Sequence, residues 1–343
     1  MDYKIIDNWD SYFNLFYPAQ KDIYYTEEYM KLYESETDRG VCFVCQDGDK
    51  VLLFPFLVRE FEFQGKTYKD FETAYGYGGP LYNTEDEVFI TTALKSLKEY
   101  CAKNGYVAGF VRFHPMLANI KGFNQVGLLI ADRQTIAMDL SMSEDEMWMN
   151  EVHTKNRNVI KKAVKEGLTF EADYEYKYLK EFVNLYNSTM FKLSADLFYY
   201  FDDAYYEKLV KSIPNSFLGV VKNDEQILSA AIFMYSEPFG HYHLSGSDKT
   251  QLCLSPNNYM LWEAAKELKK HNVMHFHLGG GTTSGNEDSL FLFKKKFSKF
   301  TFQFYIGKLI FNEDAYNDIC AEWIKNNPEK AEIYKHHLLK YKY

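Results

Sequence analysis

Residues 217–244 read FLGVVKNDEQILSAAIFMYSEPFGHYHL, and this stretch decides the fold class. Its apolar runs predict three strands, which cover residues 217–221, 227–235 and 239–244. The middle run is apolar almost throughout, as is typical of a strand in the centre of a sheet. We therefore expect this middle strand to lie in the centre of its sheet.

A predicted helix and a further strand follow this stretch, after a loop over residues 245–254. Ser255 and Pro256 are a favourable N-cap and first helical residue. The inner stripe of the helix consists of Leu261, Ala264, Ala265 and Leu268. Residues 273–278 return as a strand, so the second half of the chain predicts a mixed α/β unit.

The first half of the chain repeats this order. A helix is predicted from Thr84, with Glu87 completing a capping box, to Gly105. The predicted strands cover residues 51–58, 61–63 and 106–113, with a turn at 64–66 and a loop at 74–80. The repetition predicts duplication of one α/β unit, and a length of 343 residues fits two domains.

The composition is that of a folded globular protein, with 46% hydrophobic and 25% charged residues. The formal net charge is −9, so no global positive field attracts nucleic acid or anionic lipid. Any contact with phosphates must come from a local basic patch. Aromatic residues reach 18%, and they either line a groove for a large amphiphilic substrate or reflect compositional bias.

The sequence shows no sign of export. The first thirty residues include several aspartates and no apolar segment, so we expect no secretory signal peptide. No apolar run approaches the ~20 residues that cross a bilayer. The five cysteines are scattered and odd in number, and Cys42 and Cys45 fall on opposite faces of a predicted strand. We therefore predict a cytoplasmic protein with reduced thiols.

The strongest predicted helix lies between the two halves, over residues 143–167. Ser143 and Glu146 form a capping box, and Gly167 ends the helix. The predicted buried face consists of Trp148, Val152, Val159, Ile160, Ala163 and Val164. The basic side chains of the helix are Lys155, Arg157, Lys161, Lys162 and Lys165. These five residues are either an ordinary solvated face or the local phosphate patch.

A glycine-rich segment stands between a predicted strand and a short helix, where phosphate loops occur. Residues 279–285 read GGGTTSG, but Asn286 and Glu287 replace the Lys and Ser or Thr that nucleotide hydrolysis requires. The segment is still compatible with another role, that of a loop whose backbone comes close to a ligand. Residues 291–297 then read FLFKKKF, and one of these lysines could be a fixed cation near a developing oxyanion. In the alternative, all three extend into solvent.

Four histidines occupy two predicted strands. His241 and His243 share one face, and His275 and His277 share one face of the next strand. Such a group could bind zinc if the faces coincide, or the histidines could simply pack and form hydrogen bonds. The sequence contains no nucleophile elbow, zinc-protease motif or paired carboxylates, so hydrolase activity has no support.

Six segments, in their order and separations, resemble the Fem family of peptidoglycan-bridge aminoacyltransferases. In the second half they are KNRNVIKKAVKEGL (155–168), YNSTMFKLSAD (186–196), HLGGG (277–281) and FKKKF (293–297). In the first half they are ETAYGYGGPLYN (72–83) and FVRFHPMLAN (110–119). The resemblance covers nearly the whole chain and depends on the ordered set.

The resemblance implies an α/β, mixed α+β, fold of two tandem domains of the GCN5-related N-acyltransferase (GNAT) type, each a mixed central sheet flanked by helices. The first domain would comprise residues 1–140 plus 312–343, with returning C-terminal helices, and the second residues 141–311. The implied reaction moves an aminoacyl group from aminoacyl-tRNA to an amine of a peptidoglycan or other cell-envelope precursor. It needs no cofactor or metal, and transient contact with a membrane surface is compatible with it.

The resemblance also assigns site residues. Phe293 and Lys294 match the family's Phe-Lys pair, whose Lys is thought to stabilise the negative charge as the amine attacks the ester carbonyl. Lys192 stands where relatives often have Arg for a substrate phosphate, which keeps the charge but loses the bidentate geometry. Tyr199 is a candidate second contact. The other expected substrate contacts are Tyr75, Tyr77, Gly78, Gly79, His243, Gly279 and Gly280.

Two alternatives stay open: an acyl-CoA-dependent N-acyltransferase acting on an amino sugar or other amine, and a degenerate member that only binds envelope precursors. CoA-dependent members of this fold hold the pyrophosphate on a Gln/Arg-x-x-Gly-x-Gly/Ala turn before a helix. The matching segments, 76–80 and 252–256, lack the Arg or Gln and end in Pro80 and Pro256, which have no amide hydrogen. The sequence therefore favours aminoacyl-tRNA over acyl-CoA as the co-substrate.

Overall fold

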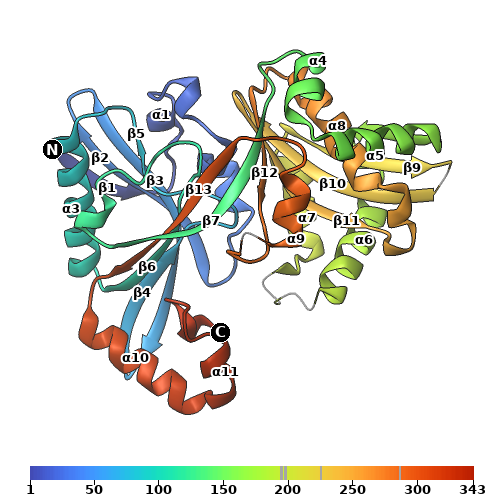
Figure 1. The fold of residues 1–343 in the computed structure, drawn as a ribbon. Coiled ribbons are helices and arrows are strands. Elements are labelled where there is room, and N and C mark those ends of the chain that lie inside the picture. The colour runs from blue at the N-terminus through green and yellow to red at the C-terminus, as the bar shows by residue number, and fades with distance from the viewer. Residues whose placement is uncertain (194–195, 197–198, 225, 286) are drawn as a thin grey trace. The chain divides into compact units, whose positions relative to one another are not determined.

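The computed structural model describes residues 1–193, 196, 199–224, 226–285 and 287–343 (Figure 1). The chain divides into two compact units. The first unit contains residues 1–20, 24–132 and 304–343, and the second contains residues 21–23 and 133–303. The unit boundaries thus fall inside two long strands, β7 (Leu128–Asp139) and β13 (Thr301–Ile310), rather than after 140 and 311. Each of these strands has residues in both units.

The sheet of the first unit has the strand order β1-β2-β3-β4-β6-β13. Neighbouring strands are antiparallel except for β4 and β6, which are parallel because helix α3 connects them. The strands are β1 (Asp2–Ile6), β2 (Asp38–Asp47), β3 (Lys50–Phe63), β4 (Lys66–Glu72) and β6 (Tyr106–Arg112), and β5 (Leu81–Tyr82) pairs with β3. The helices are α1 (Asp10–Phe13), α2 (Glu27–Lys31), α3 (Glu87–Lys103), α10 (Glu313–Asn326) and α11 (Pro328–Ile333).

The sheet of the second unit has the order β8-β9-β10-β11-β12-β7. Again one neighbouring pair is parallel, β11 with β12, because helix α8 connects the two strands. The strands are β8 (Leu168–Asp173), β9 (Ser216–Asn223), β10 (Gln226–Ser236), β11 (Phe239–Ser247) and β12 (His275–Gly280). The helices are α4 (Glu144–Glu146), α5 (Thr154–Lys165), α6 (Leu179–Lys192), α7 (Asp203–Ser212), α8 (Pro256–Lys269) and α9 (Ser289–Lys294).

The two units share one topology. In each, four antiparallel strands precede the parallel neighbour, and a sixth strand, β13 or β7, follows it antiparallel. Duplication of a mixed α/β unit, predicted from the repeated order of elements, is thereby confirmed. The sixth strand lies outside the repeated stretch of sequence in both cases, and for this reason the order of elements alone did not indicate it.

Each unit has its own hydrophobic core. In the first unit, the apolar face of α3 packs on β2 and β3, whereas α10 packs against Val107 and Ala108 of β6 in a separate cluster. In the second unit, α5 and α8 cover the face of β10 that carries Ala231 and Phe233. Helix α6 contacts β10 and β11 (Figure 1). Strand β10 lies between β9 and β11 and is central in its sheet, as expected. Within the described residues, no helix has the length and apolar character that a membrane span requires.

The predicted helix over residues 143–167 is broken. Its capping box at Ser143 and Glu146 forms, but α4 passes into one π-helical turn over Met147–Glu151, and α5 begins at Thr154 after an extended Val152. Val164, predicted to be buried, is 56% exposed, whereas Ile160 and Ala163 of the same helix are buried. Gly167 adopts the left-handed conformation after α5, as expected.

Two other predicted helix starts differ in their capping chemistry. Helix α3 is capped by Asp86, whose carboxylate accepts the amides of Val88 and Phe89, and not by Thr84. Ser255 precedes α8 as predicted but forms no side-chain cap, and its backbone is left-handed with φ of 58°. The Lys249–Leu254 segment before it is a 3₁₀-helix rather than an irregular loop.

Candidate functional site

The two parallel strands of the second unit stay paired over only a short stretch, and we call the place where their pairing ends the opening. β11 and β12 pair only from Phe239 with His275 to His241 with His277. Beyond these pairs β11 stays paired with β10, its other neighbour, as far as Ser247. A β-bulge at His243 shifts the register between β11 and β10. Strands that separate in this way leave backbone groups and side chains for a ligand at the carboxyl end of the sheet.

Lys294 lies beside this opening on the short helix α9. Its ammonium donates to the carbonyl of Gly280, the last residue of β12, over 2.7 Å, and lies 5.8 Å from the centre of the Tyr242 ring. Lys294 is buried, whereas its neighbours Lys295 and Lys296 are exposed. Burial lowers the pKa of Lys294 to about 7. The expectation that one lysine of FKKKF is held among apolar neighbours thus describes Lys294.

Phe293, the other member of the predicted pair, is half-buried. It packs on the core of the second unit, and its ring lies 5.6 Å from that of Phe297 in an edge-on arrangement. Phe293 therefore anchors α9 to the core and so fixes the position from which Lys294 extends.

The glycine-rich loop that precedes α9 is organised by Asp288. The carboxylate of Asp288 accepts the backbone amides of Thr282, Thr283 and Phe291, together with both threonine hydroxyls. Burial opposes the charge, but these hydrogen bonds hold the pKa of Asp288 well below its usual value. Any Cβ at Gly281 would lie 2.3 Å from a carboxylate oxygen of Asp288, so glycine is required there. These hydrogen-bond donors of the loop therefore bind the carboxylate of Asp288.

Gly279 and Gly280 shape the end of β12. Gly279 has φ of 79°, in the left-handed region, and Gly280 offers its carbonyl to Lys294. From the other side of the loop, Arg133 donates to the carbonyls of Gly281 and Thr282, each over 3.0 Å. The loop is therefore held at both ends, and its glycines position Lys294 and Asp288.

His243 points toward α7 and away from Lys294. Its Nε2 lies 2.8 Å from the hydroxyl of Tyr205, whereas the preceding Tyr242 packs on the core beneath α8, on the side of Lys294. Burial and the neighbouring His241 lower the pKa of His243 to about 3, so its imidazole is neutral at pH 7. The structure does not bring His243 and Lys294 together.

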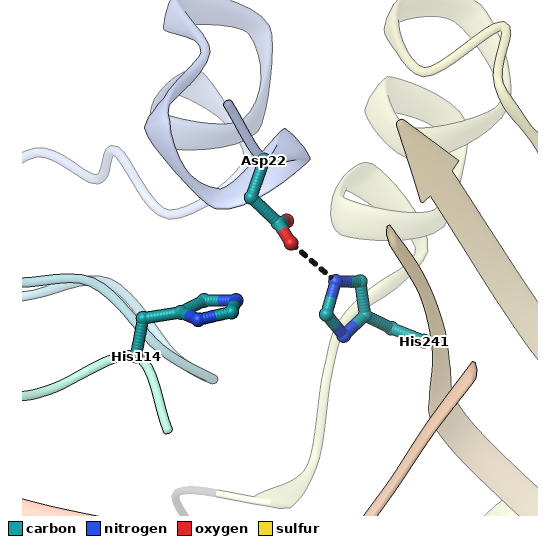
Figure 2. Close-up of side chains that lie close together, drawn as sticks. All are labelled: Asp22, His114 and His241. Carbon is teal, nitrogen blue, oxygen red and sulfur yellow. Dashed lines mark hydrogen bonds and ion pairs between the residues drawn. The ribbon is translucent and has the colours of Figure 1, made fainter. Parts of the chain in front are cut away.

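His241 forms a buried pair that the sequence did not indicate. Its Nε2 lies 2.7 Å from Oδ2 of Asp22, and both side chains are fully buried (Figure 2). The ring of His277 lies 5.8 Å from that of His241 in a T-shaped arrangement. Asp22 is 219 residues from His241 in the chain. A pair of residues this far apart in the sequence produces no local sequence pattern from which it could be predicted.

The four histidines do not form the zinc site that was considered. His243 is engaged by Tyr205, and the ring of His275 packs against Phe239 at 5.7 Å. Among the described residues of either unit taken by itself, no three His, Cys, Asp or Glu side chains bring their ligand atoms together. Structural zinc requires four such ligands and catalytic zinc three.

The predicted substrate loop of the first unit is tightly held. The carbonyl of Gly78 accepts the hydroxyl of Tyr25 and the amide of Asn119, each over 2.7 Å. Gly79 has φ of 87°, and a Cβ there would press on Phe113. The carbonyl of Tyr75 accepts the Tyr29 hydroxyl over 2.7 Å. The half-buried ring of Tyr77 packs between Tyr24 and Phe304, at 5.6 and 5.4 Å.

Two predicted substrate contacts, Lys192 and Tyr199, lie in the second unit, at the end of α6 and in the segment after it. Lys192 is the exposed last residue of α6. Hydrogen bonds from Thr250, and to a smaller extent the charge of Lys192, lower the pKa of Asp248. Tyr199 is 39% exposed, and its carbonyl accepts the hydroxyl of Tyr186 over 2.7 Å. Residues 194–195 and 197–198 between them lie outside the described part of the chain.

The basic residues of α5 divide into two kinds. Lys155, Lys161, Lys162 and Lys165 are exposed. Arg157 instead turns back to the break before α5, where it donates to the carbonyls of Trp148, Met149 and Val152 and to the hydroxyl of Thr154. These distances are 2.9 to 3.1 Å. The guanidinium therefore closes the helix break, and the assignment of Arg157 to a phosphate patch is not supported by its position.

Comparison with known proteins agrees with this architecture. Residues 152–288 match the family model described as an acetyltransferase (GNAT) domain. The crystal structure of FemX matches with a TM-score of 0.70 at 17% identity, over 92% of this chain and 99% of that chain. The chain has a Fem-type fold. The predicted resemblance is thus confirmed at the level of the fold, and so are the two tandem GNAT-like units.

Other structures share the Fem-type fold less closely. A tandem GNAT protein from the clavulanic acid biosynthesis pathway matches with a TM-score of 0.52 at 7% identity, over 91% of this chain and 99% of that chain. The C-terminal domain of a putative lysylphosphatidylglycerol synthetase from Agrobacterium fabrum matches at 0.51 and 15% identity, over 80% and 85%. No curated protein sequence matches the chain. These comparisons establish the fold of the chain, and the GNAT match ends at Asp288, before Lys294.

Proposed function

We propose that this protein is an N-acyltransferase that moves an aminoacyl group from aminoacyl-tRNA to an amine of a peptidoglycan or other cell-envelope precursor. The observation behind the proposal is the buried ammonium of Lys294 at the carboxyl end of β12, where β11 and β12 have separated. A buried amine is costly, and proteins retain one where its charge or its altered pKa is used.

The chemistry of such a transfer demands little from the protein. The acceptor amine attacks the ester carbonyl, a C–N bond forms, the C–O bond to the terminal ribose breaks, and the amine proton passes to the released hydroxyl or to water. An activated ester mainly requires positioning and stabilisation of the oxyanion. In this proposal the ammonium of Lys294 stabilises the oxyanion, and Asp288 and Gly280 fix its position.

The turn before α8 supports aminoacyl-tRNA over acyl-CoA. A pyrophosphate would need several backbone amides that point outward from this turn. The amides of Gln251 and Ser255 instead donate to Asp248 and Leu252 within the turn, and Pro256 has no amide hydrogen. We therefore expect acetyl-CoA to bind no more tightly than about 1 mM.

The test is a transfer assay on the full chain. The protein is incubated with charged tRNAs, with acyl-CoAs or with neither, in the presence of a pool of muropeptide precursors, and the acceptors are analysed for mass shifts. An aminoacyl mass shift that requires tRNA supports the proposal. A shift that requires acyl-CoA, together with micromolar affinity for acetyl-CoA in calorimetry, would establish the alternative. Binding of precursors without any shift would identify a degenerate binding protein.

A further inference from the structure

The first unit contains a groove of about 220 Å³ between the end of strand β3 and helix α10. The proposed transfer does not use this groove, because Lys294 and the opening belong to the second unit. The lining consists of Phe61, Glu62, Phe63, Ile319, Glu322, Trp323, Asn326, Asn327 and Tyr341. The groove is smaller than a typical drug-sized site, so it suits a small ligand.

The aromatic rings of the lining are accessible to a ligand. Phe61 and Phe63 pack against the hydrophobic cluster that contains Ile319, so their rings lie on the α10 side of β3. Tyr341 belongs to the same cluster, and its ring centre lies 5.6 Å from that of Phe61. Trp323 follows Ile319 on α10 by four residues and therefore shares its face of the helix. All of these aromatic side chains are half-buried, and none is fully buried.

Glu322 supplies a negative charge on the same face of α10, three residues after Ile319. Its side chain is exposed, and its Oε2 accepts the side-chain amide of Gln64 over 3.2 Å. Among the residues that the structure describes, Glu322 forms no ion pair. Glu62 alternates with the two phenylalanines of β3, so its carboxylate lies on the other face of the sheet, where it accepts the hydroxyl of Thr67.

A cation of the protein already lies against part of this aromatic cluster. The guanidinium of Arg59 is 5.0 Å from the centre of the Phe61 ring and 5.7 Å from that of the Tyr341 ring. Its charge is balanced by Asp70, which accepts two hydrogen bonds from it. The negative faces of these rings thus stabilise a positive charge. The groove offers further rings and the carboxylate of Glu322, but within the described residues no lysine or arginine lines it.

We propose that this groove binds a small quaternary ammonium ion, whose charge faces Glu322 and whose methyl groups contact the aromatic rings. Ring faces attract such cations, and proteins commonly recognise quaternary ammonium groups with several aromatic side chains. The carboxylate of Glu322 adds an attraction that a neutral ligand of the same shape lacks. A phosphate next to the ammonium would be repelled by Glu322, so we expect a free cation rather than a lipid headgroup.

The test compares two ligands of the same shape on the full chain. Choline carries the charge, and in 3,3-dimethylbutan-1-ol a carbon atom replaces its nitrogen. Both are titrated at the same ionic strength, and the indole N–H signals of the tryptophans are followed by NMR. Trp323 is the reporter, and Trp9, Trp148 and Trp262, which lie outside the lining, are references. We expect a saturable shift of the Trp323 signal with choline and about tenfold weaker binding of the alcohol.

A pair of variants separates the charge from the shape of the groove. Glu322→Gln keeps an acceptor for Gln64 but removes the charge, and it should weaken choline binding about fivefold without changing the affinity for the alcohol. Glu329→Gln, at an exposed position of α11 outside the lining, should change neither affinity.

Three results would overturn the proposal: no saturable shift of the Trp323 signal with choline, equal affinity for choline and the alcohol, or equal effects of Glu322→Gln and Glu329→Gln. Glycerophosphocholine tests the source of the ammonium group. Tighter binding of this ligand than of choline would overturn the assignment to a free cation and indicate a lipid headgroup. The comparison of ligands needs no variant, so it decides the question even if a variant does not fold. None of these measurements depends on the acyl-transfer assay, so the two proposals can fail separately.

Discussion

Lys294 is the proposed oxyanion donor, and its burial carries a structural cost. Its ammonium is buried with a single acceptor, Gly280, among the described residues. We predict that Lys294→Met lowers turnover by about 10²–10³, because one oxyanion donor typically contributes ~3–4 kcal/mol to the transition state. The assay is the aminoacyl transfer described above, with Lys295→Met as the matched exposed control. Equal activity of Lys294→Met and wild type would remove Lys294 from the reaction.

The same substitution should stabilise the fold at neutral pH. The folded pKa of Lys294, about 7, lies below its ordinary value of 10.5, so folding favours the neutral amine. This cost is absent above pH 10.5 and grows as the pH falls toward 7. Lys294→Met should therefore raise the free energy of unfolding by about 2 kcal/mol at pH 7, with a smaller gain at pH 10. Denaturant titrations at the two pH values measure this difference.

The pH dependence of the reaction tests whether Lys294 acts as a cation. As the pH rises through about 7, the ammonium loses its proton and can no longer stabilise an oxyanion. The ratio of wild-type to Lys294→Met turnover should therefore fall between pH 6 and pH 9. Taking the ratio cancels the opposite effect of pH on the acceptor amine. A ratio that rises with pH would instead indicate that the neutral amine is the active form.

At the scale of elements, the break before α5 depends on one guanidinium. Arg157 donates to three carbonyls that the break leaves without helical partners. We predict that Arg157→Met destabilises the second unit by about 1–3 kcal/mol, since the part-buried carbonyls of Trp148 and Val152 lose their donor. Lys155→Met, at an exposed position of the same helix, should change stability by less than about 0.5 kcal/mol. Chemical denaturation of the three proteins provides the comparison.

The exposed lysines of α5 are the remaining candidates for contact with an RNA donor. Charge reversal of Lys155, Lys161 and Lys165 should weaken binding of aminoacyl-tRNA and reduce the slope of log affinity against log salt. Binding of the acceptor precursor should not change. If the salt slope of the triple variant equals that of wild type, these lysines are an ordinary solvated face.

The elements were predictable where a local pattern determines them. The strands of the second unit follow from apolar runs, and the capping box at Ser143 follows from its spacing with Glu146. The start of α3 was assigned to Thr84 because Thr84 and Asp86 are both good caps, and only the structure shows which one accepts the amides of the first turn. The break at Val152 has no signal in periodicity, because Arg157 stabilises it through carbonyls up to nine residues away.

The candidate site was predictable in part. Lys294 was predicted from the family resemblance and from its apolar sequence neighbours, and the structure shows that its side chain is buried. Asp288 was missed, although an aspartate just before a short helix after a glycine run is a typical N-cap. The pair of Asp22 with His241 could not be found, since it depends on a contact between distant segments.

At the scale of the whole molecule, partly buried ion pairs attach the C-terminal tail to the first sheet. The ammonium of Lys342 lies 2.7 Å from carboxylates of both Asp38 and Glu72, and Arg112 also pairs with Glu72. Burial alone would raise the pKa of Glu72, but Arg112 and Lys342 hold it below its usual value. The pKa of Asp38 is likewise lowered by Lys342 in spite of burial.

Loss of Lys342 should therefore destabilise the first unit in a pH-dependent way. We predict that Lys342→Met lowers the free energy of unfolding by about 1–3 kcal/mol at pH 7, because two carboxylates lose their common cation. The depressed pKa values stabilise the fold above the unfolded values near 4, and this contribution is lost as the pH falls below them. The difference between variant and wild type should thus persist from pH 7 to about pH 4 and shrink below it. A constant difference would show that Lys342 acts through packing alone.

The discontinuity of the first unit sets an order of events during synthesis. Its sixth strand β13 and its helices α10 and α11 are encoded after nearly all of the second unit. Domains generally fold as they emerge from the ribosome, the N-terminal one first. In this chain the first unit begins to be synthesised first and is completed last. One edge of strand β6 therefore has no pairing partner until β13 has been synthesised. We therefore expect a chain that terminates before residue 304 to expose the edge of β6 and to be prone to aggregation.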